Sequence, residues 1–175
     1  MAIIGDIHGC YDELSELLDL IDWSPHTHTV ILTGDLIDRG PKIKDTLHFA
    51  STTPNVYSLM SNHEWKLLRY LRGHPVQTNS LAKTIQQCGE AFLRHPSFLK
   101  WLESLPFIVR WADNSYVVHA GIRPDRPISR QRKTIAYILE RGIQKADKFL
   151  IKARTLGGIR TPISTFHIGI ILLLR

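Results

Sequence analysis

Four apolar segments of this chain each end in a short polar turn, and this arrangement limits the folds open to it. The segments, which we interpret as buried strands, are residues 2–4, 30–33, 55–60 and 116–118. Segments with helical features separate or follow them: residues 11–22, 42–51, 64–71 and 80–105, the last broken near Gly89 and Pro96. Strands that alternate with helices predict an α/β fold with parallel strands. Such sheets bind ligands beyond the carboxyl ends of their strands, where the polar turns would lie.

The four turns contain the ligand types of a metal site. They read Gly-Asp-Ile-His-Gly (5–9), Gly-Asp-Leu-Ile-Asp-Arg-Gly-Pro (34–41), Ser-Asn-His-Glu (61–64) and His-Ala-Gly (119–121). Their carboxylates, imidazoles and one amide suit borderline divalent metals better than a thiolate site would. Taken singly, each turn also has a structural explanation, such as a helix start with Asn62 as N-cap. Four such turns in this order, each after an apolar strand, favour the metal site.

These blocks resemble the signature motifs of calcineurin-like metallophosphoesterases, in the phosphoprotein-phosphatase branch. That branch contains Ser/Thr protein phosphatases and symmetrical diadenosine-tetraphosphate hydrolases. Residues 9–14 (Gly-Cys-Tyr-Asp-Glu-Leu) and 66–76 are similar to bacterial dinucleoside-polyphosphate hydrolases in particular. The resemblance covers roughly residues 1–125 and implies the α-β-β-α sandwich of that family.

The resemblance also implies a role for eight side chains in a phosphoesterase that uses a dinuclear metal centre. The metal ligands would be Asp6 and His8 on one ion, Asn62 and His119 on the other, and Asp35 on both. The two divalent ions would be manganese, with iron, zinc or nickel as alternatives. His63 would be the general acid, oriented by Asp38, and Arg39 would clamp the phosphate. A surface salt bridge is the alternative role for Arg39.

The sequence departs from the family pattern after residue 122. It lacks the Gly-His-Thr block that completes the second metal site in relatives, and its one histidine after His119 is His167. His167 is a further candidate ligand by its separation from His119, although its neighbours do not match the block. We therefore expect an incomplete metallophosphoesterase domain over residues 1–150, with the C-terminal part of the second sheet missing, and an atypical tail over 151–175. The alternative to an active hydrolase is a weak or inactive remnant that binds metal or a partner.

Charge is unevenly distributed along the chain. Residues 1–122 hold 10 Lys and Arg against 13 Asp and Glu, whereas residues 123–175 hold 12 against 3. A basic segment can indicate a nucleic-acid partner, but we favour a solvated basic helix that balances the acidic metal site. The expected substrate is a phosphorylated small molecule, such as a dinucleoside polyphosphate, or a phosphoprotein.

Cysteine content and apolar runs give the expected compartment. Two cysteines, Cys10 and Cys88, do not make a disulfide framework, and residues 1–3 do not resemble a signal peptide, so we expect a cytoplasmic protein. The apolar run 166–174 is shorter than the ~20 residues that cross a bilayer, so no membrane partner is expected. An incomplete sheet would leave an exposed edge, which favours self-association.

Overall fold

Two β-sheets flanked by helices form the described part of the chain. The computed structural model describes residues 1–112, 115–121, 127 and 130. The strands are β1 (Ala2–Ile4), β2 (Val30–Leu32), β3 (Val56–Ser58), β4 (Ile108–Ala112) and β5 (Ser115–Val118). The helices are α1 (Tyr11–Leu20), α2 (Ile43–Thr52), α3 (Asn62–Leu71), the 3₁₀ turn η1 (Asn79–Leu81), α4 (Ala82–Cys88), α5 (Glu90–Leu93) and α6 (Pro96–Ser104).

The first sheet is parallel and has the order β1-β2-β3. Ile3 is opposite Ile31, and Ile31 is opposite Tyr57, so the three short strands end close to the same level. The turns that follow β1, β2 and β3 therefore meet at one edge of the sheet. The second sheet is the antiparallel pair β4-β5, in which Val109 is opposite Val117.

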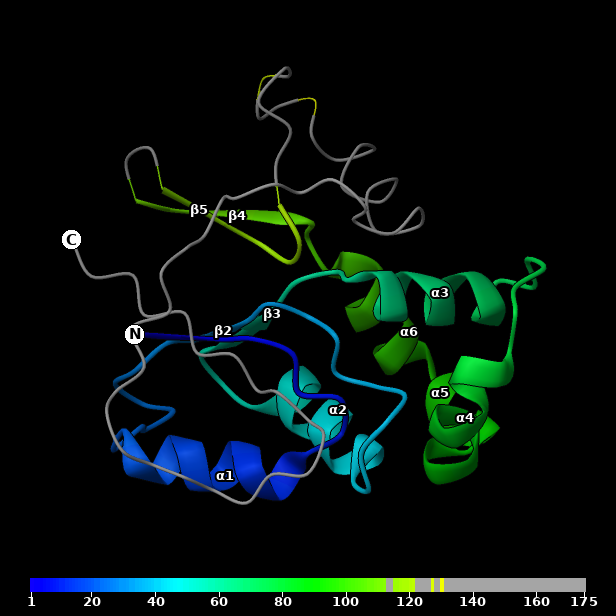
Figure 1. Ribbon diagram of the computed structural model, residues 1–175, viewed down its shortest axis with the longest axis horizontal. Helices are drawn as coiled ribbons and strands as arrows, with labels where there is room; N and C mark the ends of the chain where they lie inside the picture. The colour runs from blue at the N-terminus through cyan, green and yellow to red at the C-terminus, as the bar shows by residue number, and fades with distance from the viewer. Residues whose placement is uncertain (113–114, 122–126, 128–129, 131–175) are drawn as a thin grey trace.

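Alternate side chains of the parallel sheet enter two different cores. Helices α1 and α2 lie on one side of the sheet and the β4-β5 pair on the other (Figure 1). Ile4 and Leu32 belong to the larger core, with Leu14 of α1. Ile3 and Ile31 instead join Val117 of β5 in a smaller core between the two sheets. This two-sided burial explains why the strands read as continuous apolar runs.

The helices that follow β3 cover the remaining edge of the larger core. Leu67 of α3, Leu93 of α5 and Leu102 of α6 are fully buried in it. Among the helices that the structure describes, none has the length and apolar character needed to cross a bilayer.

Most predicted elements are present, with two corrections. The expectation of parallel strands holds for β1–β3 but is wrong for residues 116–118, because this strand pairs antiparallel with β4, a strand that the sequence pattern did not reveal. The N-cap of α3 is Ser61 and not Asn62: the Ser61 hydroxyl accepts hydrogen bonds from the backbone N–H groups of His63 and Glu64. Ser61 has an extended backbone with φ −97°, so a side chain is tolerated there.

Gly34, at the end of β2, provides a test of how tightly the turns are packed. Its φ is +104°, and a Cβ built there would lie 2.7 Å from the Ser61 Cβ. Gly73 has φ +77° but open space around it, so it is a matched control. We expect Gly73→Ala to lower the free energy of unfolding by about 1–2 kcal/mol, the backbone cost alone. Gly34→Ala should cost about 1–3 kcal/mol more, because the added methyl group overpacks the turn. Urea denaturation of both variants measures the difference, and equal losses would contradict the packing described here.

Candidate metal centre

The turns after β1 and β2 are curled by left-handed residues. His8 has φ 50°, Asp35 has φ 51° and Asp38 has φ 87°. Aspartate and histidine are among the residue types that adopt this conformation most readily, but it still costs about 1–3 kcal/mol at each position. Hydrogen bonds between the turns offset that cost: the backbone N–H groups of Ile7 and His8 donate to the Asp35 carbonyl at 3.1 and 2.7 Å. The two turns therefore hold each other in place.

Glu64 fixes the Asp35 turn from helix α3. Its two carboxylate oxygens accept hydrogen bonds from the backbone N–H groups of Asp35 and Leu36, each at 2.9 Å. The Ser61 hydroxyl donates to the same carboxylate. Glu64 is fully buried, and burial together with the nearby Asp35 charge raises the pKa of Glu64. The sequence pattern included this residue in a polar turn without revealing that it supports the neighbouring turn.

Four titratable side chains converge around the Asp35 carboxylate. Asp35 Oδ2 lies 3.4 Å from His8 Nε2 and 3.7 Å from His63 Nε2. Asp35 Oδ1 lies 3.5 Å from His119 Nε2, and His119 Nδ1 lies 3.9 Å from Asp6 Oδ1. Two groups result, each with ligand atoms within 4.8 Å of one another: His8, Asp35 and His63, and Asp6, Asp35 and His119. Asp35 belongs to both groups.

The donor set fits divalent cations. His8 Nε2 and Asp35 Oδ1 are buried and have no hydrogen-bond partner among the described residues. The Nδ1–H groups of His8 and His119 donate to the Ile37 and Thr33 carbonyls, at 2.6 and 3.0 Å, which leaves each Nε2 lone pair for a metal. Burial also lowers the pKa of His8 and so favours the neutral ring that can bind a metal. Buried polar atoms without partners cost about 1–3 kcal/mol each, and a bound cation would remove that cost.

The remaining predicted ligands, Asp6, Asn62 and His167, are less buried than Asp35 or lie outside the described residues. The Asp6 side chain is 46% exposed, and burial of the remainder, followed by the Asp35 charge, raises the pKa of Asp6. Asn62 is the first residue of α3, directly before His63, and is partly buried; its role as a ligand stays a prediction. His167 and the tail 151–175 lie outside the described residues.

His63 and Asp38 form a buried pair beside the carboxylate cluster. His63 Nδ1 lies 2.7 Å from Asp38 Oδ2, and the hydroxyl of Thr84 donates to Asp38 Oδ1 at 2.6 Å. Burial lowers the pKa of His63, but the hydrogen bond to Asp38 and the charge of Asp35 outweigh it, so the pKa is raised. The protonated ring is therefore favoured. No sequence pattern singled out Thr84, which lies on helix α4.

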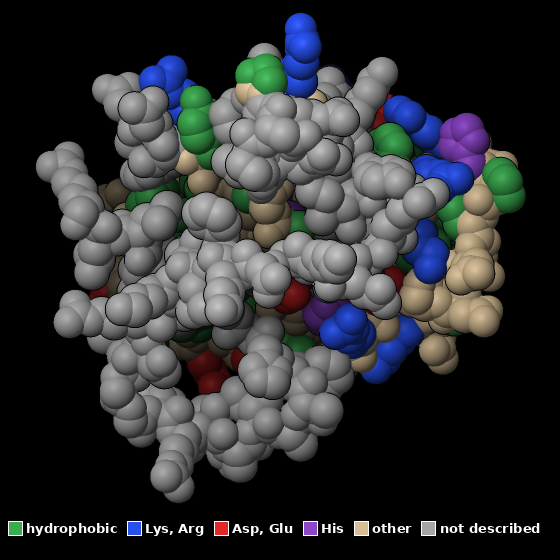
Figure 2. Space-filling model, turned by 45° about the horizontal axis from the view of Figure 1, so that its top comes forward, with side chains coloured by type: hydrophobic (Ala, Val, Ile, Leu, Met, Phe, Trp, Pro, Cys, Tyr) green, Lys and Arg blue, Asp and Glu red, His purple; other side chains and the backbone are tan. Residues whose placement is uncertain are grey.

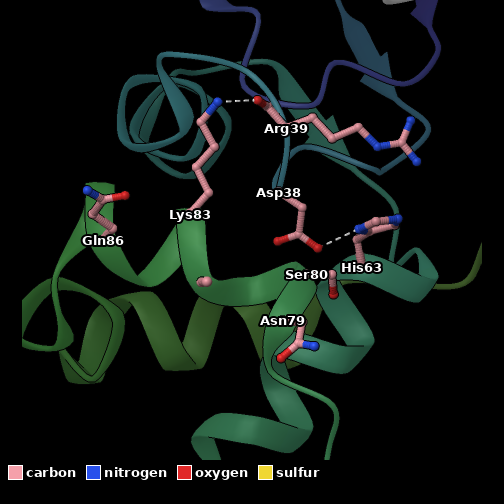
Figure 3. Close-up of a pocket in the computed structure, with 8 residues that line it drawn as sticks. Asp38, Arg39, His63, Asn79, Ser80, Lys83 and Gln86 are labelled. Atoms are coloured by element: carbon pink, nitrogen blue, oxygen red, sulfur yellow. Dashed lines mark hydrogen bonds and ion pairs between the residues drawn. The ribbon is translucent and has the colours of Figure 1, made fainter.

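Arg39 extends toward the same cluster. The residue is exposed, and within the described part of the chain its guanidinium is not paired with a carboxylate. Figure 3 shows its side chain directed away from Lys83, on the side of the pocket where His63 lies. Its charge adds to burial in lowering the pKa of His8 and opposes the rise that burial causes in the pKa of Asp6. An exposed cation near these donors suits the clamp role better than the surface salt bridge.

A carboxylate–histidine cluster lies at the carboxyl edge of the parallel sheet, and comparisons with known proteins show the family to which the chain belongs. The profile of the calcineurin-like phosphoesterase family matches residues 1–167, and the chain belongs to this family. A crystal structure provisionally assigned to a diadenosine tetraphosphatase matches with a TM-score of 0.59 and 30% sequence identity, over 74% of this chain and 54% of that one. The predicted fold class is confirmed.

Two curated relatives are symmetrical bis(5′-nucleosyl)-tetraphosphatases. The protein from Neisseria meningitidis serogroup A / serotype 4A is 38% identical over 133 residues, which cover 73% of this chain and 45% of the relative. The protein from Salmonella paratyphi C is 36% identical over 124 residues, which cover 70% of this chain and 43% of the relative. The chain thus spans less than half the length of these relatives.

Thr84 provides a test of the Asp38–His63 pair. Thr84→Val keeps the shape of the side chain but leaves a buried Asp38 oxygen without its donor, so we expect a loss of about 1–3 kcal/mol in the free energy of unfolding. Thr46→Val is the matched control, because Thr46 is also fully buried and its hydroxyl donates to the Lys42 carbonyl, which keeps the Thr46 N–H. Urea denaturation measures both variants. Equal losses would show that the Thr84–Asp38 bond contributes nothing of its own.

Proposed function

We propose that this chain forms a phosphoesterase domain that uses two divalent ions, manganese as the first candidate, to hydrolyse dinucleoside polyphosphates. The observation that carries the proposal is the Asp35 carboxylate, which lies within reach of both groups of ligand atoms and keeps one buried oxygen unpaired. Membership of the calcineurin-like phosphoesterase family supports it.

Five side chains would hold the metals: Asp6, His8, Asp35, Asn62 and His119. When bound, the two ions would neutralise phosphoryl oxygens and make a water molecule acidic enough to attack phosphorus at neutral pH. The carboxylate of Asp35 would reduce the repulsion between two doubly charged ions that lie close together. The buried imidazoles of His8 and His119 would add neutral ligands, each oriented by a backbone carbonyl.

The remaining residues would bind the phosphate and move the proton. The planar guanidinium of Arg39 can donate two parallel hydrogen bonds to phosphate oxygens. His63 would donate its proton to the oxygen of the leaving group as the bond from phosphorus to that oxygen breaks. Asp38 would keep the ring protonated and oriented, and Thr84 would keep Asp38 in place. His63 would then recover its proton from solvent.

The names of the relatives support the nucleotide substrate over the phosphoprotein. Both are symmetrical bis(5′-nucleosyl)-tetraphosphatases, so the corresponding reaction here would release two nucleoside diphosphates. We expect a higher kcat/KM with diadenosine tetraphosphate than with a phosphoserine peptide, both measured with saturating Mn²⁺. A higher kcat/KM with the peptide would favour the phosphoprotein instead.

Asp35→Asn tests the metal assignment. The substitution removes one negative charge from the point that both ligand groups share, so we expect hydrolysis to fall by at least about 100-fold. Asp19→Asn is the control, since Asp19 is an exposed carboxylate on α1. Phosphate release with saturating Mn²⁺ measures both variants. Near-normal turnover of Asp35→Asn would contradict the assignment, and metal binding without turnover by the unaltered chain would favour the non-catalytic alternative.

A further inference from the structure

A pocket of about 580 Å³ opens beside the candidate centre. Asp38, Arg39 and His63 line it on the side of the centre, and residues of η1 and α4 line the rest (Figure 3). The lining residues from these helices are Asn79, Ser80, Ala82, Lys83 and Gln86. The pocket is thus continuous with the centre through the pair Asp38–His63.

The position of His63 indicates which part of the substrate would enter this pocket. A general acid lies next to the oxygen that leaves, so the departing group extends from the centre on the side of the general acid. His63 stands between the Asp35 cluster and the pocket, since its Nε2 faces Asp35 at 3.7 Å while the residue also lines the pocket. The pocket therefore lies where the leaving group would be.

The chemistry of the lining suits an anionic group. The Lys83 ammonium donates one hydrogen bond to the Arg39 carbonyl at 2.5 Å, and two of its three N–H groups remain for a ligand. Lys66 donates to the Ser80 hydroxyl at 2.6 Å, which places a further cation at the rim. The Asp38 carboxylate is not paired with these cations, because its side chain is only 2% exposed and its two oxygens are bound to His63 and Thr84.

The lining also restricts the shape of the ligand. Among the described residues that line the pocket, Ala82 is the one apolar side chain, and there is no Phe, Tyr or Trp to stack on a base. The lining itself combines Lys83 and Arg39 with His63, Asp38 and three uncharged polar side chains; in the view of Figure 2, Lys and Arg side chains likewise lie beside His and acidic side chains. Such a surface binds phosphate groups and sugar hydroxyls better than it binds an apolar peptide.

We propose that the pocket is a leaving-group subsite that binds the phosphates of the departing nucleoside diphosphate, with Lys83 as its principal cation. The inference rests on the proposed function and specifies its substrate. A water molecule releases one proton to solvent as its oxygen forms the new bond to phosphorus. The bond from phosphorus to the bridging oxygen breaks, and that oxygen takes the proton of His63. Lys83 and its neighbours neutralise the diphosphate that departs, so they favour polyphosphate leaving groups over an uncharged alcohol.

Binding of ADP and of inorganic phosphate to the Mn²⁺-loaded protein, followed by calorimetry, tests the subsite. Inorganic phosphate is expected at the two Mn²⁺ ions, where the positive charge is highest, whereas ADP is long enough to extend from the ions into the pocket. We expect Lys83→Ala to weaken ADP binding by about tenfold, because a charged hydrogen bond is lost, and to change phosphate binding by less than about twofold. Lys100→Ala removes a charge from an exposed position on α6 and should leave both affinities unchanged.

Lys83→Ala also removes the hydrogen bond to the Arg39 carbonyl, so a second variant that keeps this bond is needed. Gln86→Glu retains Lys83 and adds a negative charge to the pocket, so it should also weaken ADP binding several-fold and spare phosphate binding. Unchanged ADP affinity in Lys83→Ala, an equal loss for ADP and phosphate, or no ADP binding to the unaltered protein would each overturn the subsite. If the expected binding pattern is found without any hydrolysis, the subsite stands and the proposed function fails.

Discussion

The position of the Asp35 carboxylate is the constraint on which the candidate centre depends. Its backbone is left-handed, a conformation that the turn cannot hold without support. Glu64 supplies that support through two backbone N–H groups, and the turn after β1 supplies more through the Asp35 carbonyl. The folded chain thus holds one carboxylate where His8 and His63 lie near one of its oxygens and His119 lies near the other.

The residues proposed for metal binding and those proposed for proton transfer are positioned by different elements of the fold. The parallel sheet brings the turns of Asp6 and Asp35 together, and β5 brings His119 from the second sheet. Helix α4 positions the residues around the proposed general acid His63, because Thr84 donates a hydrogen bond to Asp38 and Lys83 donates one to the Arg39 carbonyl. Metal binding would therefore depend on the two sheets and their turns, whereas proton transfer and leaving-group binding would both depend on helix α4.

Those candidate site residues that directly follow a predicted strand could be predicted from the sequence. Asp6, Asp35 and His119 stand at the ends of apolar runs. The parallel sheet brings the ends before Asp6 and Asp35 to one edge, and β5 of the second sheet brings His119 to the same place. Thr84 could not be found in this way, because its partner Asp38 is 46 positions away and nothing distinguishes it from other buried threonines. The alternative role of Asn62, as N-cap of α3, belongs to Ser61 instead, since serine and asparagine are both good N-caps. The antiparallel β4-β5 pair was missed because Arg110 divides the apolar residues of 108–112 into two short pieces.

Electron paramagnetic resonance of the Mn²⁺-loaded protein tests the shared carboxylate most directly. Two ions that share Asp35 would lie about 3.5–4 Å apart and would be magnetically coupled. If Asp35 is shared, we expect two Mn²⁺ to bind per chain and to give the multiline spectrum of a coupled pair. A spectrum of isolated ions at every loading, or the binding of a single ion, would contradict it.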